Sequence, residues 1–393
     1  MVDSPLLTPL YHWHQAQGAK LVPFAGWQMP LQYAGIVAEH LHTRSAASLF
    51  DVSHMGQLLL TGRGADRALE QLLPGDIVGL AEGRMRYSLL TLSHGGILDD
   101  LMVVRLPTSD DEAVQGAASQ EADSQEAASR LHLVINAARR QVDEAHLRAH
   151  LPPDLQLEAL NSRALLALQG PTAAAILAPL SPQATDLPFM GAAELMVGDI
   201  PCLVMRSGYT GEDGFELSCA AEDAVALADL LIAQEGVLPA GLGARDSLRL
   251  EAGLCLYGHD IDEQTNPVEA GLVWTIAKHR RDDSQGFLGA AAVLSALKNK
   301  AAAGARQRVG LTLAAGNPPA REGAVIENLA GQPIGVVTSG GFSPSLQLPI
   351  AMGYVPADVA AGGVQVVVRG QRYPATLTLL PFVPNRYVRP TKP

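Results

Sequence analysis

Hydrophobic and polar residues follow one another along this chain in short runs, and glycine or proline stands between most of the runs. The 38 Gly and 26 Pro residues predict many short helices and strands that are joined by tight turns. Over the first three quarters of the chain, runs with helical spacing mix with β-like runs, which predicts an α+β fold class. The expected helices span residues 34–48, 65–73, 223–234 and 287–298, and the expected strands and hairpins span 49–60, 87–104, 131–136, 164–169 and 202–219.

Towards the C-terminus the pattern changes to short β-runs at regular spacing, with Gly, Pro and Asn between them. This spacing predicts a small antiparallel barrel or sandwich. The runs are residues 309–313, 324–328, 334–338, 350–355, 364–369 and 373–380. We therefore expect an α+β region over residues 1–300 and an all-β, barrel-like domain over residues 305–393.

One segment departs from both patterns. Thr108–Ser129 carries six acidic residues and no Lys or Arg. Its Ala, Ser, Gln and Glu content cannot bury much apolar surface, so we expect a disordered or weakly helical surface insertion that takes no part in the chemistry. The whole chain has a formal net charge of −12, which argues against nucleic acid as its main partner.

The composition also bears on the compartment. No apolar run approaches the ~20 residues that a membrane helix needs. The first residues lack the basic and then apolar pattern of a signal peptide. Cys202, Cys219 and Cys255 lie far apart and form no C-x-x-C pair. We therefore expect a cytoplasmic protein with buried, reduced thiols and no membrane partner.

Several common catalytic motifs are absent from the sequence. It contains no P-loop, no H-E-x-x-H and no G-x-S-x-G. His12 and His14, like His40 and His42, are two residues apart, and such side chains point in different directions on a helix. We expect surface or capping roles for them, no metal, and no covalent nucleophile. An enzyme of this kind would position a reactive cosubstrate and act through electrostatics.

The stretch Gly208–Leu217 packs three glycines and three acids into ten residues. In an extended run Glu216 points away from its two apolar neighbours, so its carboxylate faces either a cavity or solvent. In a cavity it could accept two adjacent N–H groups of a ligand. Glu212 and Asp213 lie at the turn, where we expect them to bond the local backbone.

A second acidic pair, Asp99-Asp100, interrupts an apolar strand. Adjacent strand residues point to opposite faces, so only one of the two should enter a site; the other interpretation is a strand-end acid paired with Arg. Arg245 follows a Gly-rich loop, and we expect Asp246 to cap the helix that begins there. Arg249, one turn on, is expected to make a structural ion pair.

Seven segments, taken together and in order, resemble one family. They are Phe50-Asp-Val-Ser-His-Met-Gly56, Gly95-Gly-Ile-Leu-Asp-Asp-Leu101, Ala167-Leu-Gln-Gly-Pro171, Gly208-Tyr-Thr-Gly-Glu-Asp-Gly-Phe-Glu216, Gly241-Leu-Gly-Ala-Arg-Asp-Ser-Leu-Arg-Leu-Glu-Ala-Gly253, Val337-Thr-Ser-Gly340 and Pro381-Phe-Val383. This series resembles the T-protein of the glycine cleavage system, the tetrahydrofolate-dependent aminomethyltransferase. The resemblance covers nearly the whole chain except the acidic insertion.

The resemblance implies a three-domain cloverleaf around a central folate site, with two interleaved α+β domains followed by the β-barrel. It also implies a reaction. The one-carbon unit passes from the aminomethyl-lipoyl arm of H-protein to tetrahydrofolate, ammonia is released, and 5,10-methylenetetrahydrofolate forms. The implied cosubstrate is tetrahydrofolate, without a metal. The implied partner is lipoylated H-protein, with the P- and L-proteins in the same pathway.

The resemblance also assigns residues. It implies that Asp100 is catalytic, where a carboxylate can orient the amine and stabilise the cationic carbon that forms as ammonia leaves. It implies that Glu216 binds the pterin. The other implied folate-binding residues are Arg245, Tyr387, Tyr87, Asn136 and Tyr209. The family's Asn-Ala-Ala-Asn reads Asn136-Ala-Ala-Arg139 here, which is a departure from the pattern.

The roles of four more residues stay open. His54 is either a structural, site-lining residue or a general base, and Trp274 either stacks on folate or lies in the core. Arg386 and Arg389 are both candidates to meet the folate tail.

Two other functions share this fold. One is a folate-binding protein without transferase activity, whose relatives carry Lys-Gly-Cys-Tyr where this chain has Arg206-Ser-Gly-Tyr209. The other is a folate-dependent demethylase, whose relatives tend to lack the Asp-Val-Ser-His-Met segment that is present here. Both differences favour the aminomethyltransferase.

Overall fold

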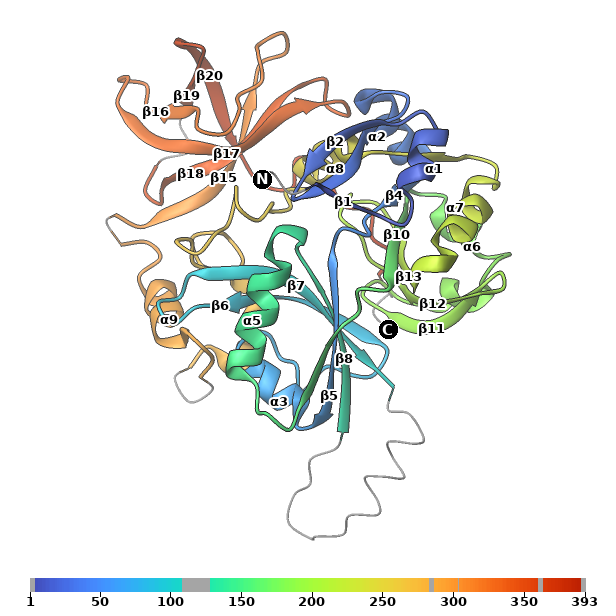
Figure 1. Cartoon of the computed structure of the whole chain (residues 1–393). Coiled ribbons are helices and arrows are strands. Elements are labelled where there is room, and N and C mark those ends of the chain that lie inside the picture. The colour runs from blue at the N-terminus through green and yellow to red at the C-terminus, as the bar shows by residue number, and fades with distance from the viewer. Residues whose placement is uncertain (1–3, 108–127, 283–285, 303, 360–362, 390–393) are drawn as a thin grey trace.

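The computed structural model describes residues 4–107, 128–282, 286–302, 304–359 and 363–389 (Figure 1). Its strands form four sheets, one of which closes into a barrel. None of the helices in these ranges is long and apolar enough to cross a membrane. The acidic insertion expected over residues 108–129 lies outside the described residues, except that Ala128 and Ser129 begin strand β8.

The first large sheet has the strand order β11-β12-β13-β10-β4-β14. Its strands are β4 (Ala47–Asp51), β10 (Arg163–Gln169), β11 (Ala192–Val197), β12 (Ile200–Met205), β13 (Gly214–Ala220) and β14 (Val237–Pro239). Helices α6 (Ala173–Leu177) and α7 (Ala224–Ile232) pack on one face of this sheet. Their Leu177, Leu227 and Leu231 join Phe215 and Leu217 of β13 in one buried cluster.

The second large sheet has the order β6-β7-β8-β5-β9. Its strands are β5 (Gly56–Arg63), β6 (Arg84–Thr91), β7 (Ile97–Leu106), β8 (Ala128–Ile135) and β9 (Gln156–Ala159). Helices α3 (Ala65–Glu70) and α5 (Arg140–His150) cover one face, as the blue and green ribbons of Figure 1 show. The other face packs against the first sheet, where Val104 and Val134 meet Phe50, Leu165 and Leu203.

The two sheets interleave along the chain, because the chain leaves the first sheet after β4, builds β5 to β9, and returns with β10. The single strand expected over residues 49–60 is therefore wrong. The chain turns between β4 and β5, where the backbone N–H of Met55 donates to the carbonyl of Val52 at 3.0 Å. Both strands are buried, so apolar residues stand on both sides of this turn. Hydropathy alone therefore did not indicate where the first strand ends.

The C-terminal strands close into a barrel with the order β15-β18-β17-β16-β19-β20, drawn in orange and red in Figure 1. The strands are β15 (Arg306–Leu313), β16 (Val325–Glu327), β17 (Pro333–Ser343), β18 (Leu348–Pro356), β19 (Val364–Val368) and β20 (Gln371–Thr378). Leu311, Ile326, Val337 and Val366 fill its interior. The predicted mixed α+β class with a C-terminal barrel is confirmed, and closure decides for the barrel over the sandwich.

The remaining elements lie around these three bodies. They are β1 (Leu6–Leu7), β2 (Lys20–Phe24) and β3 (Trp27–Gln32), which form a small sheet; helices α1 (Tyr11–Ala16), α2 (Ile36–Ser45), α8 (Leu242–Glu251) and α9 (Ala290–Lys298); and 3₁₀ helices η1 (Ala137–Arg139), η2 (Pro182–Asp186), η3 (Ala221–Asp223), η4 (Val273–Thr275) and η5 (Lys278–Arg280).

Helix α8 begins earlier than expected, at Leu242, so the predicted N-cap at Asp246 is wrong and that residue lies exposed within the helix. Gly241 is the N-cap residue, and its N–H donates to the carboxylate of Glu39 at 2.9 Å. The acceptor comes from α2, more than two hundred residues away, so no local signal marked this start. The ion pair expected for Arg249 is confirmed, with its guanidinium 2.9 Å from Asp260.

Two histidines that we expected at the surface are buried, because α1 and α2 turn them inward. His14 lies with Nε2 2.8 Å from the carboxylate of Asp51 and Nδ1 2.8 Å from the hydroxyl of Tyr33. His40 lies with Nε2 3.0 Å from the carboxylate of Glu251. Each histidine ties a helix to a distant part of the chain.

Candidate active site

The catalytic candidate lies on the face of β7 that looks toward the first sheet. Asp100 alternates with Met102 and Val104, which pack in the layer between the two large sheets. Asp99 alternates with Leu101 and points to the opposite, helix-covered face, where it is fully buried. The structure thus separates the two acids as the strand pattern predicted.

Glu216 faces the same layer from the other sheet. It pairs in register with Ala167 and Met205, both of which pack between the sheets. Its neighbours Phe215 and Leu217 point to the other face. The carboxylates of Asp100 and Glu216 therefore converge on one layer from two different sheets, a juxtaposition that only the sheet packing creates.

Asn136 orients the carboxylate of Asp100 through a hydrogen bond. It follows the last residue of β8, and its side-chain amide donates to Asp100 Oδ1 at 2.8 Å and to Asp99 Oδ1 at 2.9 Å. Its backbone N–H donates to Asp99 Oδ2 at 3.1 Å. One residue at the end of a strand thus holds both carboxylates of the neighbouring strand.

The pKa of Asp100 is raised to about 7. Burial is the largest cause, and the nearby charge of Asp99 adds to it, while hydrogen bonds from Tyr87 and Asn136 act in the opposite direction. A carboxyl group with this pKa changes its protonation state near neutral pH, which suits a group that assists proton movement.

Two aromatic rings stand beside Asp100. Tyr87 of β6 stacks on Trp274 of η4, with ring centroids 5.3 Å apart. Burial and the charge of Asp100 raise the pKa of the Tyr87 hydroxyl, so it stays protonated. The Trp274 side chain is 63% exposed, which excludes the core interpretation and places a flat apolar surface at the rim of the site.

Arg245 lies between Glu216 and Tyr209. Its guanidinium carbon lies 4.8 Å from the ring centroid of Tyr209, and its charge interacts with that of Glu216. The Tyr209 hydroxyl donates to the carbonyl of Cys255, and the charge of Asp100 reaches the same phenol. The buried Nη1 of Arg245 has no hydrogen-bond partner among the described residues. A buried guanidinium N–H without an acceptor favours a ligand that brings one.

One oxygen of the Glu216 carboxylate accepts a hydrogen bond from a neighbouring side chain. The hydroxyl of Ser207 donates to Glu216 Oε2 at 2.5 Å. Sequence reasoning missed Ser207, although its place just before the glycine-rich turn, across from Glu216 in the same hairpin, offered a signal.

Tyr387 lies on the far side of the same turn. Its ring stacks on Phe189 with centroids 4.2 Å apart, and burial raises its pKa to about 12. The segment around it returns from the barrel, since the N–H of Arg386 donates to the carbonyl of Gly211 at 2.8 Å. Arg389 lies over the Phe189 ring. Tyr387 therefore adjoins the glycine-rich turn rather than the Asp100 cluster.

The other two acids of that turn do not bond the local backbone as expected. Glu212 pairs with Arg44 at 2.7 Å and with Arg386 at 2.5 Å. Asp213 pairs with Arg206 at 2.7 Å. All three partners come from outside the turn, so the expectation was wrong, and both acids act as anchors for the glycine-rich turn that carries Tyr209.

His54 is buried, and its Nδ1 has no partner among the described residues. Burial lowers its pKa to about 4, and the charges of Arg245 and Arg140 act in the same direction. The imidazole is therefore neutral at pH 7, and its ring makes an edge contact with the ring of Phe24.

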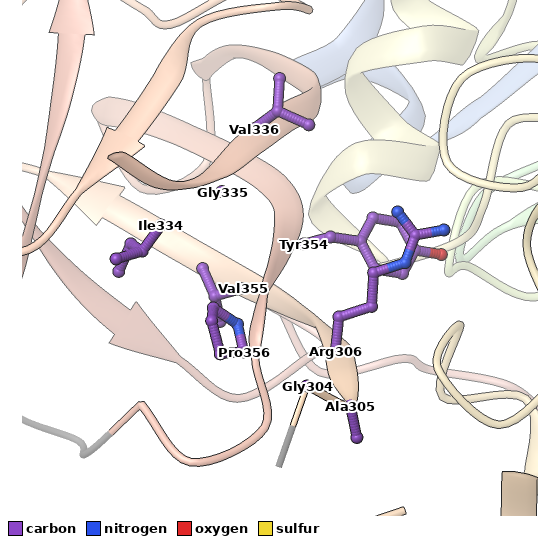
Figure 2. A pocket seen from close by; sticks show the side chains of 9 residues that line it. All are labelled: Gly304, Ala305, Arg306, Ile334, Gly335, Val336, Tyr354, Val355 and Pro356. Carbon is purple, nitrogen blue, oxygen red and sulfur yellow. The ribbon is translucent and has the colours of Figure 1, made fainter. Parts of the chain in front are cut away.

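Two cavities lie elsewhere in the molecule. Figure 2 shows one of about 190 Å³ at the barrel, lined by Arg306, Val336 and Tyr354 among others. The other, of about 350 Å³, is lined by Trp27, Arg140 and residues near them. Neither is lined by a predicted site residue. Within the described ranges, no three His, Cys, Asp or Glu side chains are grouped to hold a metal ion.

Comparisons with known proteins identify the family. The model of the GCVT N-terminal domain matches residues 10–132 and 124–280. The model of the glycine cleavage T-protein C-terminal barrel domain matches residues 306–384. The chain belongs to the glycine cleavage T-protein family. It is an aminomethyltransferase of the glycine cleavage system, as the resemblance implied.

Full-length relatives agree with this assignment. A mitochondrial aminomethyltransferase of Gallus gallus is 46% identical over 391 residues, covering 97% of this chain and 93% of the relative. That of Flaveria anomala is 43% identical over 397 residues, covering 98% and 91%. The crystal structure of the glycine cleavage system aminomethyltransferase T from Bartonella henselae matches with a TM-score of 0.86 and 43% identity, covering 98% of this chain and all of that one.

The relatives also bear on the compartment. Both curated relatives named above are mitochondrial proteins, which contradicts the cytoplasmic location that the sequence led us to expect, although the solved structure comes from a bacterium.

Proposed function

We propose that this family member transfers a one-carbon unit from the aminomethylated lipoyl arm of H-protein to tetrahydrofolate. The sulfur–carbon and carbon–nitrogen bonds of the aminomethyl group break, and two carbon–nitrogen bonds to the folate form. The two N–H protons of the folate are released, one to the lipoyl thiol and one to ammonia. The P- and L-proteins would act on the same H-protein arm in other steps of the pathway.

The observation that carries the proposal is the convergence of Asp100, Glu216 and Arg245 on one layer between the sheets. Tetrahydrofolate has a pterin edge with adjacent N–H groups and an acidic tail. Glu216 offers a carboxylate to the first, and the unpartnered Nη1 of Arg245 offers a donor to a polar atom of the same ligand. The residues present therefore fit a folate.

In this proposal Asp100 is the catalytic group. As ammonia leaves, the carbon that is being transferred becomes cationic, and a nearby carboxylate stabilises it. Asn136 keeps the carboxylate oriented through its 2.8 Å hydrogen bond. Tyr87 and Tyr209 contribute ring surface on either side, and Tyr387 contributes from the segment after the barrel.

We also propose that residues 1–300 act as the folate-binding region and that residues 305–393 act as the barrel domain. The direct bond between Arg386 and Glu212 supports a role for the post-barrel segment in shaping that region.

The test is one assay with tetrahydrofolate and aminomethylated, lipoylated H-protein, in which methylenetetrahydrofolate and ammonia are followed together. Both products should form, and only in the presence of folate. The Asp100→Asn variant should lose most turnover while folate binding is kept, because Asn is isosteric but uncharged. Folate binding without either product from the wild-type protein would instead favour a demethylase or a non-catalytic folate-binding protein.

A further inference from the structure

A third buried carboxyl group lies behind the catalytic candidate. Asp143 is on α5, one turn before Leu147, and both side chains are fully buried. Residues four apart share one face of a helix, so Asp143 points the same way as Leu147, which packs against Leu101 of β7. Asp99 lies on that same face of β7. The helix therefore sets Asp143 against Asp99, where each carboxyl group affects the pKa of the other.

The hydrogen bonds around this pair are unequal. Asp99 accepts two N–H groups of Asn136, at 2.9 and 3.1 Å. No hydrogen-bond donor among the described residues reaches either oxygen of Asp143. Two buried carboxylates in contact cannot both stay ionised, and a buried carboxylate without donors is the costlier one. The shared proton therefore belongs on Asp143.

We propose that Asp143 is a positioning residue, held as the neutral acid, which donates its proton to Asp99 and keeps Asp99 ionised so that Asn136 stays fixed against Asp100. The proposal rests on the proposed catalytic role of Asp100. It extends that role to a chain of contacts that runs from α5 through β7 to the end of β8.

The surrounding charges agree with this protonation state. Burial is the main cause that raises the pKa of Asp143, to about 10, and Asp99 and Asp100 of β7 add to the rise. Arg139 of η1 acts in the opposite direction, but its guanidinium is shared with Glu263 at 2.8 Å and lies over the ring of Tyr257. The phenol of Tyr257 is a further ionisable group near the pair, and the charges of Asp99 and Asp143 both act on its pKa.

The arrangement has a consequence for Asp100. If Asp143 lost its proton, its negative charge would repel that of Asp99, and Asp99 would lose the hydrogen bond that the neutral acid donates. If Asp99 were instead protonated, it would no longer accept both N–H groups of Asn136. A neutral Asp143 avoids both states and leaves one amide hydrogen bond for Asp100.

The first test is infrared spectroscopy of the intact protein at pH 7, because a protonated carboxyl group has a C=O stretch that a carboxylate lacks. The Asp143→Asn variant should lose one such band from a buried group. The control is Glu144→Gln, which alters the neighbouring, partly exposed carboxylate on the same helix and should lose none. A spectrum in which Asp143→Asn removes no band would overturn the proposal.

The second test separates positioning from folding. Asp143→Leu keeps the branched shape of the side chain but removes the donor, so kcat should fall by about tenfold with the KM for tetrahydrofolate little changed. Asp143→Asn, whose amide still donates, should recover most of that loss. Equal turnover in Asp143→Leu and wild type, or no recovery in Asp143→Asn, would contradict the positioning role.

The two proposals can fail separately. Full activity in Asp100→Asn would remove the catalytic role of Asp100, while the infrared band would still report whether Asp143 holds the proton. Loss of the band in Asp143→Asn together with wild-type kinetics in Asp143→Leu would keep the protonated pair but overturn its link to Asp100.

Discussion

At the scale of single residues, environment separates acids that the sequence presents as equals. Glu212 and Asp213 meet arginines at 2.7 Å and serve as anchors of a turn. Glu216, three residues later, meets only the hydroxyl of Ser207 among the bonds described and faces the layer between the sheets. Asp100 accepts a hydrogen bond from the Asn136 amide, and it forms no ion pair with an Arg or Lys in the part of the chain that the structure describes. These two acids are therefore the ones available to a ligand.

The pH profile of turnover should respond to Asn136. Its hydrogen bond favours the ionised form of Asp100, whose pKa is about 7. Asn136→Ala removes that bond, so the pKa should rise and the acidic limb of the kcat profile should move to higher pH. Asn299→Ala, at an exposed asparagine, is the control, and an unchanged limb in Asn136→Ala would argue against the contact.

Folate affinity should respond to Glu216. Glu216→Gln replaces one acceptor oxygen by a donor, so a single oxygen must serve both Ser207 and the ligand. Binding of tetrahydrofolate should weaken by ~1–3 kcal/mol, measured by calorimetry. Glu158→Gln, at an exposed strand position of β9, should bind as tightly as wild type. Unchanged affinity in Glu216→Gln would take this residue out of the site.

At the scale of elements, α8 is the connection between the bodies. Its Arg249 reaches Asp260 and Ser339, and its Glu251 accepts hydrogen bonds from Ser343 and Ser345 of the barrel side. Burial acts to raise the pKa of Glu251, but bonds and charge from His40 outweigh it and hold the pKa at about 2. Because this value lies below the usual one, the stabilisation is present above about pH 4.5 and is lost as pH falls toward 2.

Removing the cation between these elements should be costly. Arg44 is nearly buried and pairs with Glu212 at 2.7 Å and with Glu251 at 2.9 Å. Arg44→Met would leave two buried acids with one cation fewer, and the free energy of unfolding should fall by about 3–5 kcal/mol in urea denaturation. Arg148→Met breaks the exposed pair with Glu144 and should cost only about 0.3–0.5 kcal/mol. Similar losses of unfolding free energy in both variants would show that the buried ion pairs stabilise the protein no more than the exposed pair does.

At the scale of the whole molecule, the way in which the two large sheets interleave along the chain governs how the site forms. The second sheet is built entirely between two strands of the first, so the layer that carries Asp100 and Glu216 forms only when both sheets are complete. The barrel contributes through the segment that follows it, which bonds to the glycine-rich turn. The acidic insertion joins β7 to β8 at their ends remote from Asp100.

That position leads to a prediction for the insertion. Leu106 and Arg130 are paired in register, and Arg130 donates to the carbonyl of Pro107 at 3.0 Å, so the two strand ends already lie together. Replacing residues 108–127 by a short Asn-Gly turn should leave turnover and folate affinity within about twofold of wild type. A large loss in either quantity would give the insertion a functional role.

The local features of this protein follow from residues that are neighbours along the chain. Regular β-runs at the C-terminus predicted the barrel strands, and alternation in β7 and β13 predicted that Asp100 and Glu216 would each face away from their apolar or acidic neighbours. These features depend on periodicity, which is a property of neighbouring residues.

The remaining features depend on contacts between segments that are distant in the sequence. No local pattern could show that residues 49–60 divide between two sheets, that Glu39 accepts the N–H of the N-cap residue of α8, or that His14 and His40 are buried. The meeting of Asp99 with Asp143, and of Arg44 with two acids, depends on which face of one element packs on another. Long-range packing sets these contacts, so the charges that surround the site, and with them the pKa of Asp100, follow only from the folded chain.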